Sequence, residues 1–127
     1  MRRIAHLSDV HFGTEDPTLA ALAIEAVNRS NPDVVVVSGD LTQRARKREF
    51  IAARRFLDLL PEPQIVVPGN HDVPLYNLFD RFFRRLNKYQ KYITDDLTPT
   101  YVDGELAIIG VNTARSFVIK GGRINEE

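Results

Sequence analysis

One stretch decides the fold class of this 127-residue chain, Val34-Val35-Val36-Val37-Ser38-Gly39-Asp40. Four consecutive β-branched residues are apolar on both alternating faces, which is typical of a central strand in a parallel sheet covered on both sides. The Ser-Gly-Asp that follows ends the strand in a turn and leaves a carboxylate at its carboxyl end. We therefore expect an α/β fold built around this strand.

Two further apolar runs, residues 4–7 and 65–67, have the same strand-like composition. Helices are predicted between the runs, one from Asp16-Pro17 to Asn31-Pro32 and a second over about residues 46–60. Apolar residues repeat at helical spacing in the first helix at Leu19, Leu22, Ala23, Ala26 and Val27, and in the second at Phe50, Ala53, Phe56, Leu57 and Leu60. The resulting order, βαβαβ, predicts a parallel core sheet flanked by helices.

The C-terminal part of the chain adds smaller elements. Residues 75–93 have helical patterning, and the side chains of Phe79, Phe82, Phe83 and Leu86 suit packing better than nucleic-acid stacking. Asp103-Gly104 is flanked by the apolar segments Tyr101-Val102 and Leu106 to Ile109 and predicts a β-hairpin. Residues 121–127 read as a loop that enters a new helix, so we expect a fragment; a short fraying tail is the competing interpretation.

Composition indicates one globular domain over residues 1–127, with 43% hydrophobic residues and no cysteine. The absence of cysteine excludes disulfides and thiolate metal sites, and it suits a reducing compartment. The apolar stretch after the opening Met-Arg-Arg is too short for a signal peptide or a membrane span. The default expectation is a soluble, cytoplasmic protein with no membrane partner.

Each of the three predicted strands leads directly into polar side chains that can hold metal ions. Asp9 and His11 follow the first strand, Gly39-Asp40 the second, and residues 69–72, Gly-Asn-His-Asp, the third. In parallel α/β sheets, ligands gather outside the carboxyl ends of the strands. Carboxylate, imidazole and amide groups without sulfur suit Mn, Fe or Zn ions, and Asp40 could bridge two of them. Each motif alone is weak, but their combination predicts a two-metal site.

These spaced motifs resemble the calcineurin-like metallophosphoesterase family across residues 4–72, and residues 110–115 are similar to bacterial members of the cyclic-nucleotide phosphodiesterase type. The resemblance implies the N-terminal half of a four-layer α/β/β/α sandwich. It also implies hydrolysis of phosphate esters, with a lean to phosphodiesters, by a metal-bridging hydroxide. The substrate would be a small phosphate ester or a nucleotide, and nucleic acid stays open as a partner.

The same resemblance assigns roles to the site residues. It implies four metal ligands, Asp9, His11, Asp40 and Asn70. Asp40 would be shared by two divalent or mixed-valence ions. His71 would serve the leaving group or the transition-state charge, and Asp72 would orient His71.

The chain departs from the family pattern in its C-terminal motifs. The family continues with a Gly-His and a Gly-His-x-His, whereas this chain has three histidines and none after His71. The first metal therefore keeps three of four expected ligands and the second keeps two, so the second site should be weak and the chain weak or inactive alone. The absent half would also leave one face or edge of the sheet open to a homodimer or another partner.

Three interpretations follow, of which a piece of a longer active hydrolase is favoured. A complete short chain that dimerises is the second, and a non-catalytic binding or scaffold module is the third. His6 is expected to be a hydrogen-bonded core histidine, and Arg115 either a substrate contact or a surface residue. Residues 41–91 hold eleven Lys or Arg against five Asp or Glu. This excess of positive charge is typical of solvent-exposed helix faces, and the less favoured interpretation is that it attracts an anionic substrate.

Overall fold

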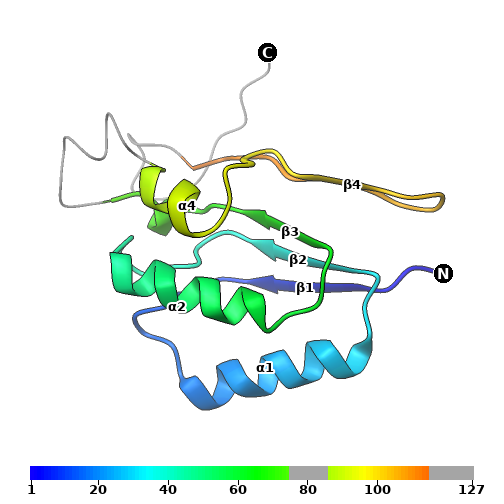
Figure 1. Ribbon diagram of the computed structural model, residues 1–127, viewed down its shortest axis with the longest axis horizontal. Coiled ribbons are helices and arrows are strands. Elements are labelled where there is room, and N and C mark those ends of the chain that lie inside the picture. The colour runs from blue at the N-terminus through cyan, green and yellow to red at the C-terminus, as the bar shows by residue number, and fades with distance from the viewer. Residues whose placement is uncertain (75–85, 115–127) are drawn as a thin grey trace.

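The computed structural model describes residues 1–74 and 86–114, and it confirms the α/β prediction (Figure 1). A parallel sheet has the order β1-β2-β3. In chain order the elements are β1 (Ile4–Ser8), α1 (Pro17–Ser30), β2 (Val34–Ser38), α2 (Lys47–Asp58), β3 (Gln64–Val67), the 3-10 turn η1 (Asn70–Asp72), α4 (Asn87–Tyr92), β4 (Thr100–Val102) and β5 (Ala107–Ile109). The arrangement is consistent with the N-terminal half of a metallophosphoesterase.

The core lies on the face of the sheet that α1 and α2 cover (Figure 1). All five residues of the stripe predicted for the second helix are buried, although Leu60 follows the end of α2, and Phe50, Ala53 and Leu57 have no exposed surface. The strands contribute Val35, Val37 and Val66 to the same cluster, beside the partly buried Ala5 and Leu7. Burial of these side chains is the main source of stability for this half of the molecule.

Helix α1 begins and ends as predicted but packs on a different stripe. Asp16 caps it by accepting a hydrogen bond from the Thr18 amide at 2.8 Å, and Asn31 ends it in the left-handed conformation. The side chains that face the core are Ala20, Ile24 and Val27, whereas Leu19, Leu22 and Ala26 are exposed. The apolar residues of α1 can be grouped into two overlapping helical stripes, one with Leu19 and Leu22 and one with Ala20 and Ile24. Packing against the sheet buries the second stripe.

The opposite face of the sheet is covered at β3 and open at β1. Gly110 lies so close to Val67 that a β-carbon on it would be 2.7 Å from a Val67 methyl group. At the other edge, Ile4 is 45% exposed, and His6 is exposed with its ring nitrogen Nε2 2.7 Å from the Ser38 hydroxyl. The expectation of a core histidine is therefore wrong, because β1 is an edge strand and His6 projects from its open face.

The predicted hairpin is present as β4 and β5, which pair antiparallel. Of the helix predicted over residues 75–93, the structure describes only α4, which packs against α2. Leu86, predicted to pack, is buried in the core. The aromatic residues predicted to pack at 79, 82 and 83, Arg115, and the C-terminal residues 121–127 lie outside the described residues. In the described part of the chain, no helix is long and apolar enough to cross a membrane.

Candidate metal centre

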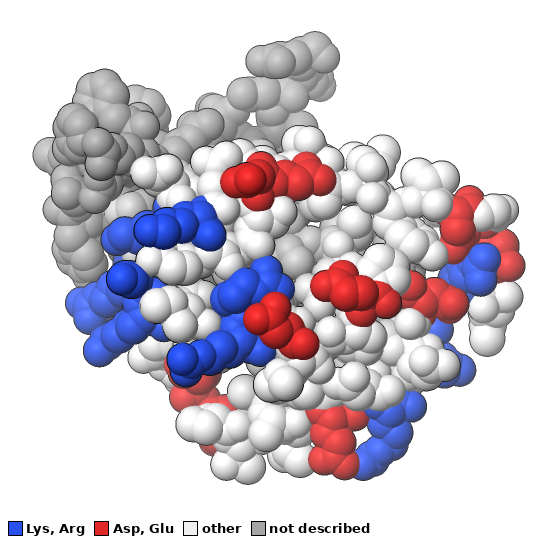
Figure 2. Space-filling view, viewed as in Figure 1, with Lys and Arg blue, Asp and Glu red and all other residues white. Residues whose placement is uncertain are grey.

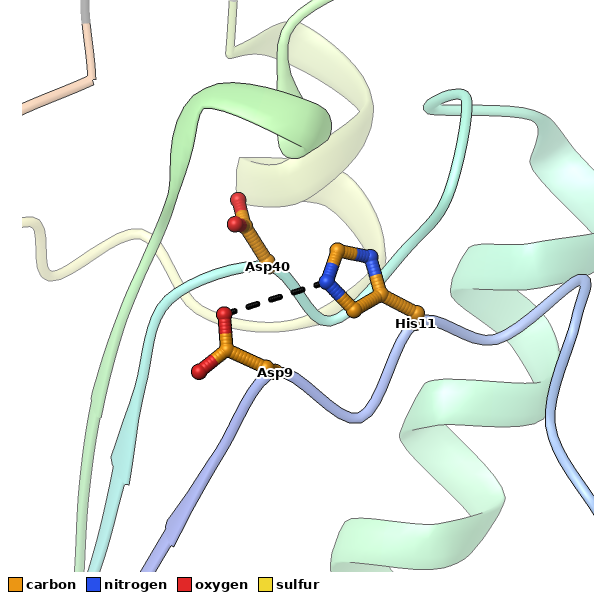
Figure 3. A group of neighbouring side chains, drawn as sticks. All are labelled: Asp9, His11 and Asp40. Atoms are coloured by element: carbon orange, nitrogen blue, oxygen red, sulfur yellow. Dashed lines mark ion pairs between the residues drawn. The ribbon is translucent and has the colours of Figure 1, made fainter. Parts of the chain in front are cut away.

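Three predicted ligands meet at the carboxyl end of the sheet. Asp9 and His11 lie on the loop after β1 and Asp40 on the loop after β2, and their ligand atoms are all within 4.8 Å of one another (Figure 3). Nε2 of His11 is 3.8 Å from Oδ1 of Asp9. Two carboxylates and one imidazole that converge in this way can hold a divalent cation.

All three of these residues have left-handed backbone conformations, with φ of 53° at Asp9, 51° at His11 and 50° at Asp40. Residues with a β-carbon seldom adopt this region, and each instance costs free energy that surrounding contacts must offset. Gly39, directly before Asp40, has φ of 75° and confirms that glycine is needed for the turn. The strain therefore coincides with the candidate ligands, which is the pattern expected of a functional site.

Pairing between the first two loops continues beyond the strands and holds this conformation. The His11 amide donates to the Asp40 carbonyl oxygen at 3.0 Å, and the Phe12 amide donates to the Leu41 carbonyl oxygen at 2.8 Å. A parallel bridge joins Phe12 to Thr42. His11 is thus fixed relative to Asp40 by main-chain hydrogen bonds, and Asp9 lies between this pairing and the end of β1.

The third loop brings Asn70 and His71 to the same place. Residues 70–72 form η1, the side-chain oxygen of Asn70 is buried, and the His71 amide donates to Asp40 Oδ1 at 2.9 Å. The His71 ring lies edge-on to the His11 ring, with centroids 4.8 Å apart. All three strands therefore contribute to one site.

The His71 ring is oriented by a main-chain carbonyl. Its Nδ1 lies 2.8 Å from the Gln43 carbonyl oxygen. Because a carbonyl oxygen can only accept, Nδ1 carries the proton in the neutral ring and Nε2 is the basic nitrogen. This arrangement differs from the prediction that Asp72 orients the ring.

Asp72 instead joins the loops after β2 and β3. Its carboxylate accepts hydrogen bonds from the Thr42 amide at 2.8 Å, the Gly69 amide at 2.9 Å and the Leu41 amide at 3.2 Å. The side chain is 1% exposed. Burial raises the pKa of Asp72 to about 6, and hydrogen bonds from Gly69, Thr42 and Leu41 oppose that rise.

Gly69 is required for a reason that the sequence did not indicate. A β-carbon there would lie 2.1 Å from Asp40 Oδ1 and 2.3 Å from the Asp40 amide nitrogen. The absence of a side chain lets the loops after β2 and β3 approach until Asp40 and His71 are in contact. Glycine is thus needed at position 69 because Asp40 lies against its α-carbon, and not because the backbone there has a positive φ.

Three supporting residues were missed in the sequence: Thr42, Gln43 and Glu49. Thr42 is fully buried between the loops, and Gln43 acts through its carbonyl group. Glu49 is 4% exposed and accepts from the Arg44 amide at 3.1 Å and the Arg46 amide at 2.9 Å. The one available signal was the Glu three residues after position 46, which is typical of the start of a helix.

Lys and Arg side chains gather on the side of the molecule where α2 begins and α4 lies (Figure 2). The exposed basic residues there are Arg46, Lys47, Arg48, Lys88 and Lys91. Lys88 Nζ is 3.4 Å from the Ala45 carbonyl oxygen, two residues from the Gln43 group that holds His71. Lys88 of the basic segment seen in the sequence thus contacts the chain between Asp40 and α2.

Comparison with known proteins agrees with this geometry. The family model described as "calcineurin-like phosphoesterase" matches residues 2–127. This chain belongs to the calcineurin-like phosphoesterase family. The family is metal-dependent, and the Asp9, His11 and Asp40 cluster is a candidate metal site of this calcineurin-like phosphoesterase chain.

A curated relative points in the same direction. The chain is 38% identical over 80 residues to a protein named glycerophosphodiester phosphodiesterase GpdQ from Enterobacter lignolyticus (strain SCF1). That match covers 54% of this calcineurin-like phosphoesterase chain and 29% of the relative. The chain therefore spans less than a third of the relative's length.

Proposed function

We propose that this calcineurin-like phosphoesterase chain belongs to a metal-dependent hydrolase of phosphate esters, with phosphodiesters as the preferred class. One observation carries the proposal, the convergence of Asp9, His11 and Asp40 within 4.8 Å at the carboxyl end of the sheet. The name of the GpdQ relative supports the choice of diesters over monoesters. The substrate is a small phosphate ester or nucleotide.

The residues present fit divalent or mixed-valence metal ions such as Mn, Fe or Zn. The donor atoms of Asp9, His11 and Asp40 lie within 4.8 Å of one another, on left-handed backbone that the pairing between the two loops holds in place. Asp9, His11 and Asp40 would hold one ion, and Asp40 with Asn70 would hold the other. When bound, a pair of ions supplies charge stabilisation and an activated nucleophile for displacement at phosphorus.

His71 is proposed as the catalytic side chain. The hydrogen bond from Nδ1 to the Gln43 carbonyl leaves Nε2 as the nitrogen available to the substrate. A protonated imidazole there can donate a charged hydrogen bond, or a proton, to the departing oxygen. Asp72 acts at a distance from the substrate, through the loops that it joins.

The ligand set within these 127 residues is proposed to be incomplete. The chain has three histidines, and His6 lies on the open face of β1 rather than in the site. We expect firm binding of one ion, weak binding of the second and low activity of this chain alone. A homodimer or further chain against the exposed edge at Ile4 and His6 is proposed to cover the sheet.

The alternative function is a non-catalytic scaffold of the same fold. The intact set of Asp9, His11 and Asp40 argues against it, since a scaffold has no need of strained ligand loops. Activity and metal binding discriminate between the two proposals.

Hydrolysis of bis(p-nitrophenyl) phosphate and p-nitrophenyl phosphate, measured with Mn²⁺ supplied, tests the proposal. We expect faster release of p-nitrophenol from the diester, and loss of that activity and of Mn²⁺ binding in Asp40→Asn. Asp58→Asn is the matched control, because Asp58 is an exposed carboxylate of α2 paired with Arg54. Mn²⁺ binding that survives in Asp40→Asn, or no binding and no hydrolysis by the unchanged chain, would contradict it.

A further inference from the structure

Thr42 lies behind the candidate metal centre and has no role in the motifs that define the site. It follows Asp40 by two residues and has no exposed surface. Its hydroxyl oxygen is 3.0 Å from the His71 carbonyl oxygen and 2.9 Å from Asp72 Oδ1, and it accepts from the Ala45 amide at 3.1 Å. One buried hydroxyl on the loop after β2 thus joins that loop to the turn after β3.

We propose that Thr42 is a positioning residue whose hydroxyl sets the separation between Asp40 and the turn that carries Asn70 and His71. The inference deepens the proposed function and rests on it, because the positioned groups are the proposed metal ligands and catalytic imidazole. Thr42 itself touches neither the substrate nor a metal ion.

The His71 peptide carries the argument. The one hydroxyl proton of Thr42 has two acceptors on this turn, the His71 carbonyl oxygen at 3.0 Å and Asp72 Oδ1 at 2.9 Å. With either acceptor the hydroxyl holds the turn, and the His71 amide of the same turn donates to Asp40 Oδ1 at 2.9 Å. A turn that moves away from Thr42 therefore also draws the His71 amide away from the Asp40 carboxylate. The Thr42 hydroxyl therefore acts on the orientation of a proposed bridging ligand.

The surroundings of Thr42 make this contact hard to replace. Its partners are the His71 carbonyl, the Asp72 carboxylate and the Ala45 amide, and hydrogen bonds at a site shielded from water are strengthened. Removal of the hydroxyl leaves the Ala45 amide and the His71 carbonyl without this partner in a place that water reaches poorly. We therefore expect the turn at residues 70–72 to move away from residue 42.

Two substitutions separate the hydroxyl from the shape of the side chain. Thr42→Val keeps the shape and removes the hydroxyl, whereas Thr42→Ser keeps the hydroxyl and removes a methyl group. Val35→Ala is the control for general loss of stability, because Val35 is fully buried in β2 on the helix-covered face. Mn²⁺ affinity is measured by titration calorimetry, and amide hydrogen exchange at His71 and Gly69 is measured without metal.

We expect Thr42→Val to bind Mn²⁺ about 10- to 100-fold more weakly, the range seen when groups that support metal ligands are lost. Exchange of the His71 amide should be faster than in the unchanged chain. Thr42→Ser should restore both properties, and Val35→Ala should bind Mn²⁺ normally although its midpoint of thermal unfolding falls.

Unchanged affinity and unchanged His71 exchange in Thr42→Val would overturn the inference, as would equal losses in Thr42→Ser or in Val35→Ala. If Thr42→Val does not fold, Thr42→Cys takes its place. A thiol is a weaker hydrogen-bond donor than a hydroxyl, so the loss of Mn²⁺ affinity should be intermediate. If the unchanged chain binds no Mn²⁺, the proposed function fails, and His71 exchange in the variants still decides whether Thr42 positions the turn.

Discussion

The helix-covered face of the sheet and the loops at its carboxyl end differ in what holds them together. On that face, α2 buries Phe50, Ala53 and Leu57 completely. These contacts are apolar, and apolar contacts do not depend on a particular direction of approach. In the loops, Asp40 and Asp72 meet main-chain amides at 2.8–3.2 Å, and Gly69 leaves no space beside Asp40. Packing should tolerate small shifts, whereas the hydrogen-bonded loops should lose metal binding after changes of a single atom.

The largest loss of stability should come from the packed face, through Leu57→Ala. Leu57 has no exposed surface, so its truncation should lower the free energy of unfolding by about 3 kcal/mol, within the range for buried leucines. Mn²⁺ affinity of the folded protein should not change. Chemical denaturation measures the free energy of unfolding, and calorimetry measures Mn²⁺ affinity. A parallel fall in Mn²⁺ affinity would contradict the difference between the packed face and the loops.

A smaller loss of stability and a larger loss of metal binding should follow Gly69→Ala. The new β-carbon would overlap Asp40 at 2.1–2.3 Å, so the loops must separate at a cost of about 2 kcal/mol. Mn²⁺ affinity should fall at least about tenfold. Gly104→Ala is the matched control, because nothing lies within 4 Å of a β-carbon there. Equal affinities in the two variants would contradict the close-approach explanation.

The junction between the regions is tested by Asp16→Ala. Asp16 ends the ligand loop and caps α1 through the Thr18 and Leu19 amides. Loss of this cap should lower the free energy of unfolding by about 1 kcal/mol, and Asp16→Asn should restore most of it. Thermal unfolding of the three proteins measures the difference. A normal midpoint for Asp16→Ala would show that the loop, not the cap, sets the start of α1.

The smallest effect is expected for Gln43→Ala. The hydrogen bond of Gln43 with His71 is made by its main-chain carbonyl, which the substitution keeps, so the change should alter the free energy of unfolding by less than about 0.5 kcal/mol. The activity should also be retained. Measurement of diester hydrolysis by this variant sharpens the comparison, since a loss of activity would show that the Gln43 side chain, rather than its carbonyl, serves the site.

Much of the fold could be predicted because each strand and helix has a local signal. The runs at 34–37 and 65–67 became β2 and β3 with one added residue each, and the Asp16-Pro17 start of α1 was correct. His6 and the exposed Leu19 were harder, because local spacing does not state which strand lies at an edge or which stripe of a helix meets the sheet.

The candidate site was predictable in its residue types and not in its supports. Asp9 and His11 follow the first predicted strand and Asp40 follows the second, and they converge because parallel strands end at one edge. The links through Thr42 and the Gln43 carbonyl depend on how two loops distant in sequence approach each other. No residue type or spacing encodes a contact made by a main-chain carbonyl.

The left-handed backbone at Asp9, His11 and Asp40 also restricts how this site can drift in evolution. Valine, isoleucine and threonine would be strained at these φ values, whereas asparagine and glycine adopt them readily. A lineage that abandons the metal could therefore exchange Asp9 or Asp40 for asparagine or glycine and keep the shape of its loops. Inactive descendants would be recognised by these neutral replacements on an unaltered backbone.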